Sequence, residues 1–408
     1  MNSGDTAFIL ISSALVMLMT PGLAFFYGGM VRRKNMLSIL MQCFIVLCAL
    51  SLQWVLFGYS LSFAPGSGFW GGLRWAGLNG VGLEPYADYS ATIPHQAFMI
   101  FQAMFAIITP ALIIGAFAER MKFSAFLIFT LLWATFVYDP VCHWVWGIGG
   151  WLRNLGALDF AGGTVVHINA GIAALVSALV IGRRKNLDHH APAPHNLPFI
   201  VLGTGLLWFG WFGFNAGSAL AANGLAVNAF VVTNTAAAAA GLSWALIEWF
   251  RHGKPTMFGT ASGVVAGLVA ITPAAGYVSV IPAIIIGILV SVICFIAVSV
   301  IKPKLGYDDS LDAFGVHCVG GIWGALATGL FASKSVNPAG ADGLFFGNPQ
   351  LFMIQLKAVA VVAAYSFIVT FVIYKLVDMI IGVRVSDKEE SMGLDLTQHQ
   401  ERAYTVLE

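Results

Sequence analysis

Charged residues are scarce in this chain of 408 amino acids. Asp, Glu, Lys and Arg make up 10% of the sequence, hydrophobic residues make up 59%, and the formal net charge is +1. A soluble fold does not need that much apolar side chain, and the lack of a basic excess gives no indication of nucleic-acid binding. The composition therefore predicts an all-α polytopic membrane protein.

Motifs of enzymes and cofactor sites are also missing. The five cysteines show no CxxC spacing and mostly lie in apolar runs, which favours neither a disulfide framework nor a zinc site. The sequence contains no Gly-rich phosphate loop, nucleotide signature or hydrolase nucleophile motif. It thus predicts neither an enzyme nor a resident cofactor or metal.

The N-terminus lacks the basic segment of a secretory signal peptide. Its apolar stretch continues to Met30, which is too long for such a peptide and predicts a first membrane span instead. Windows of about 20 apolar residues predict eleven spans in all, the eleventh being unusually long. The expected spans are 6–30, 36–60, 95–117, 124–146, 162–181, 197–220, 227–250, 257–273, 280–301, 313–332 and 351–382.

Basic residues gather in the connections that follow odd-numbered spans and in the C-terminal segment. The opposite connections contain only Arg74, Arg153, Lys334 and Lys357. Because loops rich in Lys and Arg stay in the cytoplasm, this bias predicts an N-terminus outside and a C-terminus in the cytoplasm. The basic set is Arg32, Arg33, Lys34, Arg120, Lys122, Arg183, Arg184, Lys185, Arg251, Lys254, Lys302, Lys304, Arg384, Lys388 and Arg402.

Two apolar segments each carry one histidine in the same local pattern. Val-His precedes Gly-Ile by the same spacing in both, around His167 in 162–181 and around His317 in 313–332. An ionisable side chain at membrane depth is costly unless it is paired or lines a polar pathway. A core histidine bonded to a backbone carbonyl is the alternative for either residue alone, but the matched pair favours a functional role.

These histidines lie in the fifth and tenth spans, which predicts two repeats of five helices. An odd number of helices turns the second repeat upside down, so the repeats form an inverted pair and His167 and His317 meet near the midplane of one path. The expected organisation is a transmembrane domain at 1–382 followed by a cytoplasmic tail at 383–408. The domain comprises repeat one at about 6–181, repeat two at about 197–332, and helix eleven at 351–382.

Aromatic residues supply a second indication. Phe101 and Phe105 are one helical turn apart in the third span, Phe214 lies four residues before Ser218, and Trp146 ends the fourth span. Such residues are usually core or interface anchors. Beside buried histidines, however, aromatic faces can attract a desolvated cation with roughly 0.5–2 kcal/mol each, and the Ser218 hydroxyl would favour a cation that donates hydrogen bonds.

Two metal readings stay open at this point. His189, His190 and His195 in the tract 188–198 could bind a metal, although a solvated linker is the simpler interpretation. Paired histidines on different membrane helices can also ligate a haem b, which would make the chain an electron-transfer protein.

At these residues the chain resembles the ammonium transporters of the Amt/Mep/Rh family, closest to the bacterial Amt branch. The resemblance covers residues 5–404. Its motifs are TPGLAFFYGGMVRRKN at 20–35, GAFAERMKF at 115–123, ALDFAGGTVVHINAG at 157–171, HNLPF at 195–199, GWFGFNAGS at 210–218, DAFGVHCVGGIWG at 312–324 and GLDLTQHQERAY at 393–404.

The resemblance implies a role for each matching residue. Trp146, Phe105 and Ser218 match an outer recruitment site for ammonium, and Phe105 with Phe214 a stacked phenyl gate. His167 and His317 match the pair that lines the apolar pore and relays a proton. Asp159 matches a carboxylate that supports recruitment and is implicated in deprotonation. The segment between Trp146 and Asp159 is one residue longer than the common pattern, so Trp146 is placed less firmly.

The resemblance also implies partners and a location. It implies ammonium or ammonia as substrate, net electrogenic transport, a homotrimer in the lipid of the cell inner (plasma) membrane, and a PII signalling protein at the cytoplasmic face. An ammonium sensor that acts through a cytoplasmic partner is the alternative function. The tail 383–408 is either a disordered terminus or, by resemblance, a docked regulatory segment.

Overall fold

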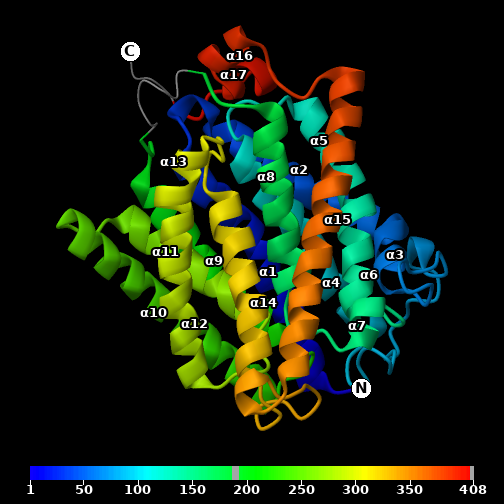
Figure 1. The fold of residues 1–408 in the computed structure, drawn as a ribbon. Helices are drawn as coiled ribbons and strands as arrows, with labels where there is room; N and C mark the ends of the chain where they lie inside the picture. Colours follow the sequence, from blue (N-terminus) through cyan, green and yellow to red (C-terminus); the bar gives the residue numbers. More distant parts are fainter. Residues whose placement is uncertain (186–192, 405–408) are drawn as a thin grey trace.

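The computed structural model describes residues 1–185 and 193–404, and these form helices and loops without a β-strand. Figure 1 shows the helices running side by side between two ends of the molecule. The main helices are α1 (Ser3–Met30), α2 (Met36–Gln53), α4 (His95–Phe117), α5 (Phe123–Trp133), α6 (Asp139–Trp146), α8 (Asn169–Ile181), α9 (Leu197–Gly217), α10 (Gly224–His252), α11 (Met257–Ile271), α12 (Val280–Ile296), α14 (Val319–Phe331) and α15 (Pro349–Ile381).

Short segments complete several of these helices. Five of them are π-helical, with backbone bonds that skip one more residue than in an α-helix: η2 (Trp54–Gly58), η4 (Ala134–Tyr138), η5 (Gly163–Ile168), η6 (Ala297–Ile301) and η7 (Phe314–Cys318). The remaining short elements are η1 (Arg33–Asn35), α3 (Tyr59–Phe63), η3 (Ala76–Leu78), α7 (Trp151–Leu155), α13 (Lys302–Leu305), η8 (Leu344–Phe346), α16 (Asp387–Met392) and α17 (Leu394–His399).

Ten helical stretches of the described chain are long and apolar enough to cross a membrane. The expected span at 257–273 differs, because α11 has only 15 residues. At 1.5 Å per residue it measures about 22 Å, less than the roughly 30 Å of a hydrocarbon core. The all-helical membrane fold is thus confirmed, while the count of eleven spans stays a prediction.

The outer surface of these helices is apolar. Phe250 on α10 is 88% exposed, and Ile368 and Met379 on α15 are 60% and 76% exposed. Side chains of this kind are stable on a surface only where lipid or another protein replaces water. The exposed rings and aliphatic chains therefore mark the sides of the bundle that face the membrane or a neighbouring subunit.

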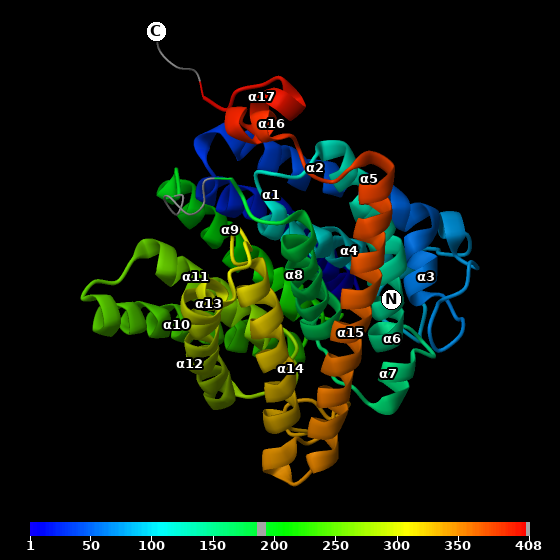
Figure 2. The same cartoon turned by 45° about the horizontal axis from the view of Figure 1, so that its top comes forward.

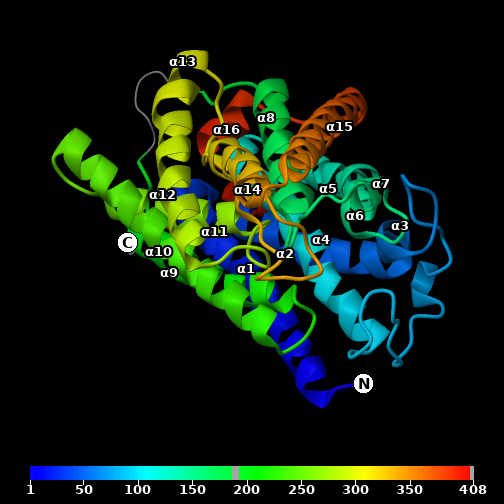
Figure 3. The same cartoon turned by 60° about the horizontal axis from the view of Figure 1, so that its bottom comes forward.

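The two ends of the bundle are named here by the chain terminus that each carries. The N-terminal face holds the start of α1 and the connection between α3 and α4, which Figure 3 shows at the edge of the molecule. The C-terminal face holds α16 and α17, which Figure 2 shows above the start of α2. The candidate site described below lies between these faces.

Buried ion pairs join the connections at the C-terminal face. Glu119 pairs with Arg32 (N–O distance 3.0 Å) and with Arg184 (3.3 Å). Arg184 also pairs with Asp308 (2.9 Å), which lies 3.7 Å from Arg120. Because these residues follow α1, α4, α8 and α13, the network links segments from both halves of the chain.

The tail is docked against the connections at the same face. The Glu390 carboxylate accepts hydrogen bonds from the Lys185 backbone (2.7 Å) and from Arg384 (2.8 Å), and Asp395 accepts one from the Ser38 backbone (2.8 Å). Glu390 and Asp395 are buried. The described part of the tail, 383–404, is therefore folded against the bundle rather than a disordered terminus.

Acid is expected to weaken the ion-pair network. The guanidinium groups of Arg32 and Arg184 hold the pKa of Glu119 below 4.5, and Arg184 and Arg120 hold that of Asp308 below 3.8, although burial alone would raise both. A carboxyl whose folded pKa is depressed adds stability above its unfolded pKa and loses it as the pH falls. The melting temperature should therefore drop below about pH 4.5.

The neighbouring Asp309 has the opposite effect on stability in acid, because burial raises its pKa. Its protonation as the pH falls below about 6 should add stability, so the melting temperature is expected to hold or rise slightly between pH 7 and 5, before the losses from Glu119 and Asp308 begin. Melting curves of the purified protein across this range test the sign. A melting temperature that rises steadily down to pH 3 would contradict the role given to Glu119 and Asp308.

Candidate functional site

The two histidines lie together in the middle of the bundle. The ring centroids of His167 and His317 are 5.5 Å apart and their planes differ by 13°. Both rings are at most 3% exposed. His167 lies in η5 and His317 in η7, and π-helical turns of this kind are often found at functional sites.

A close helix contact brings the histidines into this position. Gly171, four residues after His167, packs against the backbone of Cys318, where a Cβ atom would lie only 2.3 Å from the Cys318 nitrogen. Gly321, at the matching position after His317, packs against the Cβ of His167. Small residues allow such close approach of membrane helices, so each histidine segment is packed by the glycine of the other.

Aromatic rings continue from the histidines toward the N-terminal face. Phe214 on α9 lies 6.2 Å from the His167 ring, and Phe105 on α4 lies 4.3 Å from Phe214, measured between ring centroids. Both phenyl rings are 1% exposed. They therefore close the space above His167 with two layers of apolar side chain.

Trp146 and Ser218 lie on the N-terminal side of these rings. Trp146 meets Phe105 edge to face at 5.8 Å, and its indole N–H donates to the Asp159 carbonyl oxygen (2.8 Å). The Ser218 hydroxyl donates to the Phe214 carbonyl oxygen (2.8 Å), which leaves its oxygen able to accept. The helix α7 takes up part of the longer segment between Trp146 and Asp159 without separating them.

Asp159 has its carboxylate bound to the start of the helix that carries His167. The two oxygens accept backbone N–H bonds from Gly162 (2.8 Å), Gly163 (2.6 Å), Thr164 (2.8 Å) and Val165 (3.2 Å), and one also accepts from the Thr164 hydroxyl. A carboxylate at a helix N-terminus satisfies otherwise free N–H groups. The geometry is that of a helix cap that fixes η5.

The histidines themselves have polar atoms without partners. Both ring nitrogens of His167, and Nδ1 of His317, are buried and form no hydrogen bond within the described residues. Such groups are rare in folded proteins and indicate a strained, catalytic or ligand-binding position. A small molecule that donates or accepts hydrogen bonds would therefore be stabilised beside these rings.

Cavities lead from the histidines to the C-terminal face. A cavity of about 10 Å³, room for roughly one water-sized molecule, lies between Phe214 and the two histidines. A second cavity of about 10 Å³ continues past His317 to Asp312. It shares Met30, Phe258, Leu311 and Asp312 with a vestibule of about 480 Å³ that also contains Arg184 and Lys302.

These dimensions bear on the two metal readings. The histidine ring centroids are only 5.5 Å apart and the cavity beside them measures about 10 Å³, which is too small for a haem. His195 uses both ring nitrogens, toward the Val31 carbonyl (2.8 Å) and the Tyr404 hydroxyl (2.9 Å). His189 and His190 lie outside the described residues. Among the residues that the structure describes, no group of three or more His, Cys, Asp or Glu side chains is placed to hold a metal ion.

The structure adds two residues that the sequence reasoning missed. Trp211 stacks on His167 at 5.4 Å and is anchored by an indole N–H bond to the Thr272 hydroxyl (2.8 Å). Asp309 accepts backbone N–H bonds from Ala313 (3.1 Å) and Phe314 (2.8 Å), as Asp159 does in the first half. The eight-residue spacing from Asp159 to His167 and from Asp309 to His317 could have revealed this second cap.

The model of the Ammonium Transporter Family matches residues 7–404. The chain belongs to this family. An ammonium transporter of Bacillus subtilis (strain 168) is 58% identical over 404 residues, which cover 99% of each chain. The crystal structure of Candida albicans Mep2 superposes with a TM-score of 0.91 at 40% identity and covers 99% of this chain and 90% of that one.

A third likeness is to the solved structure of a Sensor Amt protein. It is 30% identical, has a TM-score of 0.88, and covers 97% of this chain and 98% of that chain. The apolar helices and the family membership show a multi-pass protein of the plasma membrane. As a member of this family, the protein is a transporter rather than an enzyme.

Proposed function

We propose that this transporter binds ammonium at the N-terminal face, removes a proton and passes ammonia along the two histidines to the C-terminal face. Trp146, Phe105 and Ser218 form the recruitment site, Phe105 and Phe214 the gate, and His167 and His317 the pore and proton relay. The observation that carries the proposal is the stacked histidine pair, whose unpaired nitrogens line a cavity of about 10 Å³ beneath two phenyl rings.

The selectivity follows from the cost of moving charge through a dry pore. A cation in hydrocarbon costs several kcal/mol or more, whereas neutral ammonia passes an apolar constriction at low cost. Ammonium can lose a proton before it enters, but potassium cannot. The edge-to-face rings of Trp146 and Phe105 can replace part of the lost hydration through cation–π attraction.

The role of Asp159 in this proposal is mainly one of positioning. Its carboxylate holds the N-terminus of η5, and its carbonyl holds Trp146, so it couples the recruitment site to the segment that carries His167. Direct deprotonation by Asp159 is the less favoured form of the proposal, because both of its oxygens already accept hydrogen bonds.

We also propose the membrane topology that the sequence predicts. Eleven spans would put the N-terminus outside and the C-terminus in the cytoplasm, in agreement with the basic residues of the C-terminal face. Two inverted repeats are supported by the matched caps at Asp159 and Asp309 and by the matched π-helical turns at the histidines. The repeats 6–181 and 197–332, helix eleven at 351–382 and the tail 383–408 are the proposed units.

Proteoliposomes of known lumen pH provide the test of function. An ammonium gradient should evoke a saturable inward positive current that potassium does not compete with, which would establish electrogenic transport. Lumen alkalinisation without current would instead indicate a neutral ammonia channel. If neither signal appears, the transport proposal is wrong for this chain.

Phe214→Ala is expected to weaken the gate. Phe214 fills the space between Phe105 and His167, so its removal should hydrate the entrance and lower the ammonium-over-potassium ratio by roughly tenfold, about 1.4 kcal/mol. Reversal potentials in mixed ammonium and potassium solutions measure this ratio. Phe230→Ala is the matched control, because Phe230 is a 45% exposed ring on α10, outside the proposed gate. An unaltered preference in Phe214→Ala would contradict the gate.

The sensor function is the second candidate. It is favoured by the likeness to the Sensor Amt protein and by the folded tail at the C-terminal face. In this proposal the chain is a homotrimer, and a PII signalling protein binds the cytoplasmic vestibules. Ammonium binding without transport, together with partner binding that depends on ammonium, would favour the sensor over the transporter.

A further inference from the structure

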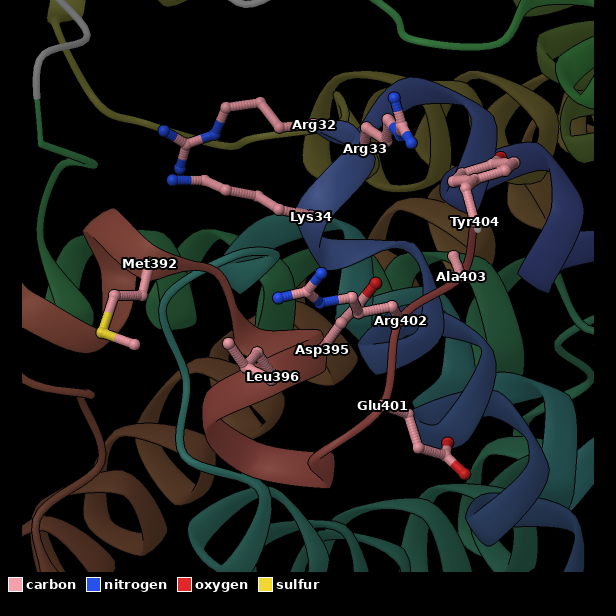
Figure 4. Close-up of a pocket in the computed structure, with 10 residues that line it drawn as sticks. All are labelled: Arg32, Arg33, Lys34, Met392, Asp395, Leu396, Glu401, Arg402, Ala403 and Tyr404. Carbon is pink, nitrogen blue, oxygen red and sulfur yellow. The ribbon is translucent and has the colours of Figure 1, made fainter. Parts of the chain in front are cut away.

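A cavity of about 500 Å³ lies on the C-terminal face, away from the transport path (Figure 4). One side of its wall is the connection between α1 and α2, and the other side is the tail from Met392 to Tyr404. Two parts of the chain that are more than 350 residues apart in sequence thus enclose one space. Any ligand held there would contact both.

Positive charge dominates this cavity. Arg32, Arg33, Lys34 and Arg402 line it, against the two carboxylates of Asp395 and Glu401. Asp395 already accepts the Ser38 N–H (2.8 Å), and Figure 4 shows the Glu401 carboxylate pointing away from Lys34 and Arg402. Of the four cations, Arg32 is paired with Glu119, whereas Arg33, Lys34 and Arg402 form no ion pair within the described residues.

The basic side chains are also partly fixed in position. The Arg32 Nε lies 3.0 Å from each oxygen of Glu119, and its Nη2 is buried without a partner within the described residues. Lys34 is held by a hydrogen bond to the Ser391 carbonyl. Figure 4 shows the cationic ends of Arg32 and Lys34 converging. The charge of Arg32 is balanced by Glu119, whereas Lys34 forms no ion pair within the described residues.

The tail contributes Arg402, a cationic side chain that makes no polar contact within the described residues. Arg402 is exposed and forms no hydrogen bond or ion pair in residues 1–185 and 193–404, whereas Arg33 lies over the Tyr404 ring at 5.1 Å from its centroid. Arg402 can therefore turn toward an anion without breaking an existing contact. A guanidinium offers several N–H groups in one plane, which suits the oxygens of a phosphate.

We propose that this cavity is a binding site for a phosphate group, held by Lys34 from the α1–α2 connection and by Arg402 from the tail. A phosphate accepts hydrogen bonds from several directions, as donors on two opposite walls require. The source is either a soluble phosphorylated compound or the headgroup of an anionic phospholipid. The bound phosphate would fasten the tail to the bundle.

Calorimetric titration of the full-length protein in a neutral detergent tests the site. The probes are inorganic phosphate and, separately, dioctanoyl phosphatidylglycerol. At least one probe should bind saturably with one site per chain, more weakly as the salt concentration rises. Arg402→Gln should weaken that binding by about tenfold or more, and Arg402→Lys by less, because the charge remains.

Lys388→Gln is the matched control, since Lys388 is an exposed cation of the same tail that does not line the cavity. It should bind both probes as the unaltered protein does. Binding of phosphate alone would identify a soluble source, and binding of the lipid alone a headgroup site. The proposal is overturned if neither probe saturates, or if Arg402→Gln and Lys388→Gln have the same affinity.

Discussion

His167→Leu is expected to abolish the ammonium-evoked current, reducing it by about a hundredfold or more, within the range of removing a positioned acid–base group. The ring lies between Phe214 and His317, so its loss breaks the contact between the gate and the second histidine. Leu has a similar bulk and needs no hydrogen bonds. The protein should therefore fold, and the effect should appear in transport alone.

Leu207→Met controls for changes in pore shape. Leu207 lines the same cavity and is 2% exposed, so the exchange alters an apolar wall without touching polar groups. Volume-conserving exchanges of this kind usually cost less than about 1.5 kcal/mol. Current through proteoliposomes that contain equal amounts of each variant gives the comparison. A normal current in His167→Leu would refute the relay.

Asp308→Asn is expected to cost roughly 3–5 kcal/mol of the free energy of unfolding, the range for breaking a buried ion pair. The Asp308 carboxylate accepts three hydrogen bonds from Arg184, through its backbone N–H, Nε and Nη2, at 2.8–2.9 Å. The side chains of Asp308 and Arg184 are only 1% and 7% exposed. An amide would remove one of the two carboxylates that pair with Arg184, and the carboxylate that pairs with the buried Arg120.

The matching control is Asp387→Asn, which removes an ion pair to Lys185 at the surface of the tail. The two side chains are 70% and 46% exposed, so solvent screens the pair and little change is expected. Thermal melting of both variants in the same detergent measures the difference. Equal melting temperatures would show that the buried network contributes no more than a surface pair.

Much of the fold and part of the site could be predicted from the sequence. Lipid selects long apolar helices, so hydrophobic windows located the spans to within a few residues of the helices observed. The shared Val-His and Gly-Ile spacing pointed to His167 and His317 as one pair. Both inferences depend on patterns that are local in the chain and repeat within it.

Contacts between segments that are distant in the chain could not be predicted from these local patterns. The sequence reasoning treated Trp211 as part of a family motif, yet its ring stacks on His167. It counted Arg32, Arg120 and Arg184 as markers of orientation, whereas they form a buried network with Glu119 and Asp308. The choice of partner for a charged side chain depends on how helices pack, and local patterns do not contain that information.

The length and spacing of apolar runs by themselves determined that this chain is a helical membrane protein, because a bilayer accepts few other backbones. Only the tertiary structure decided that the histidine rings stack at 5.5 Å beneath Phe105 and Phe214, and that the tail closes a cationic cavity. The physical reason is close packing. Gly171 and Gly321 set the approach of the two histidine segments, and that distance exists only after the helices have met.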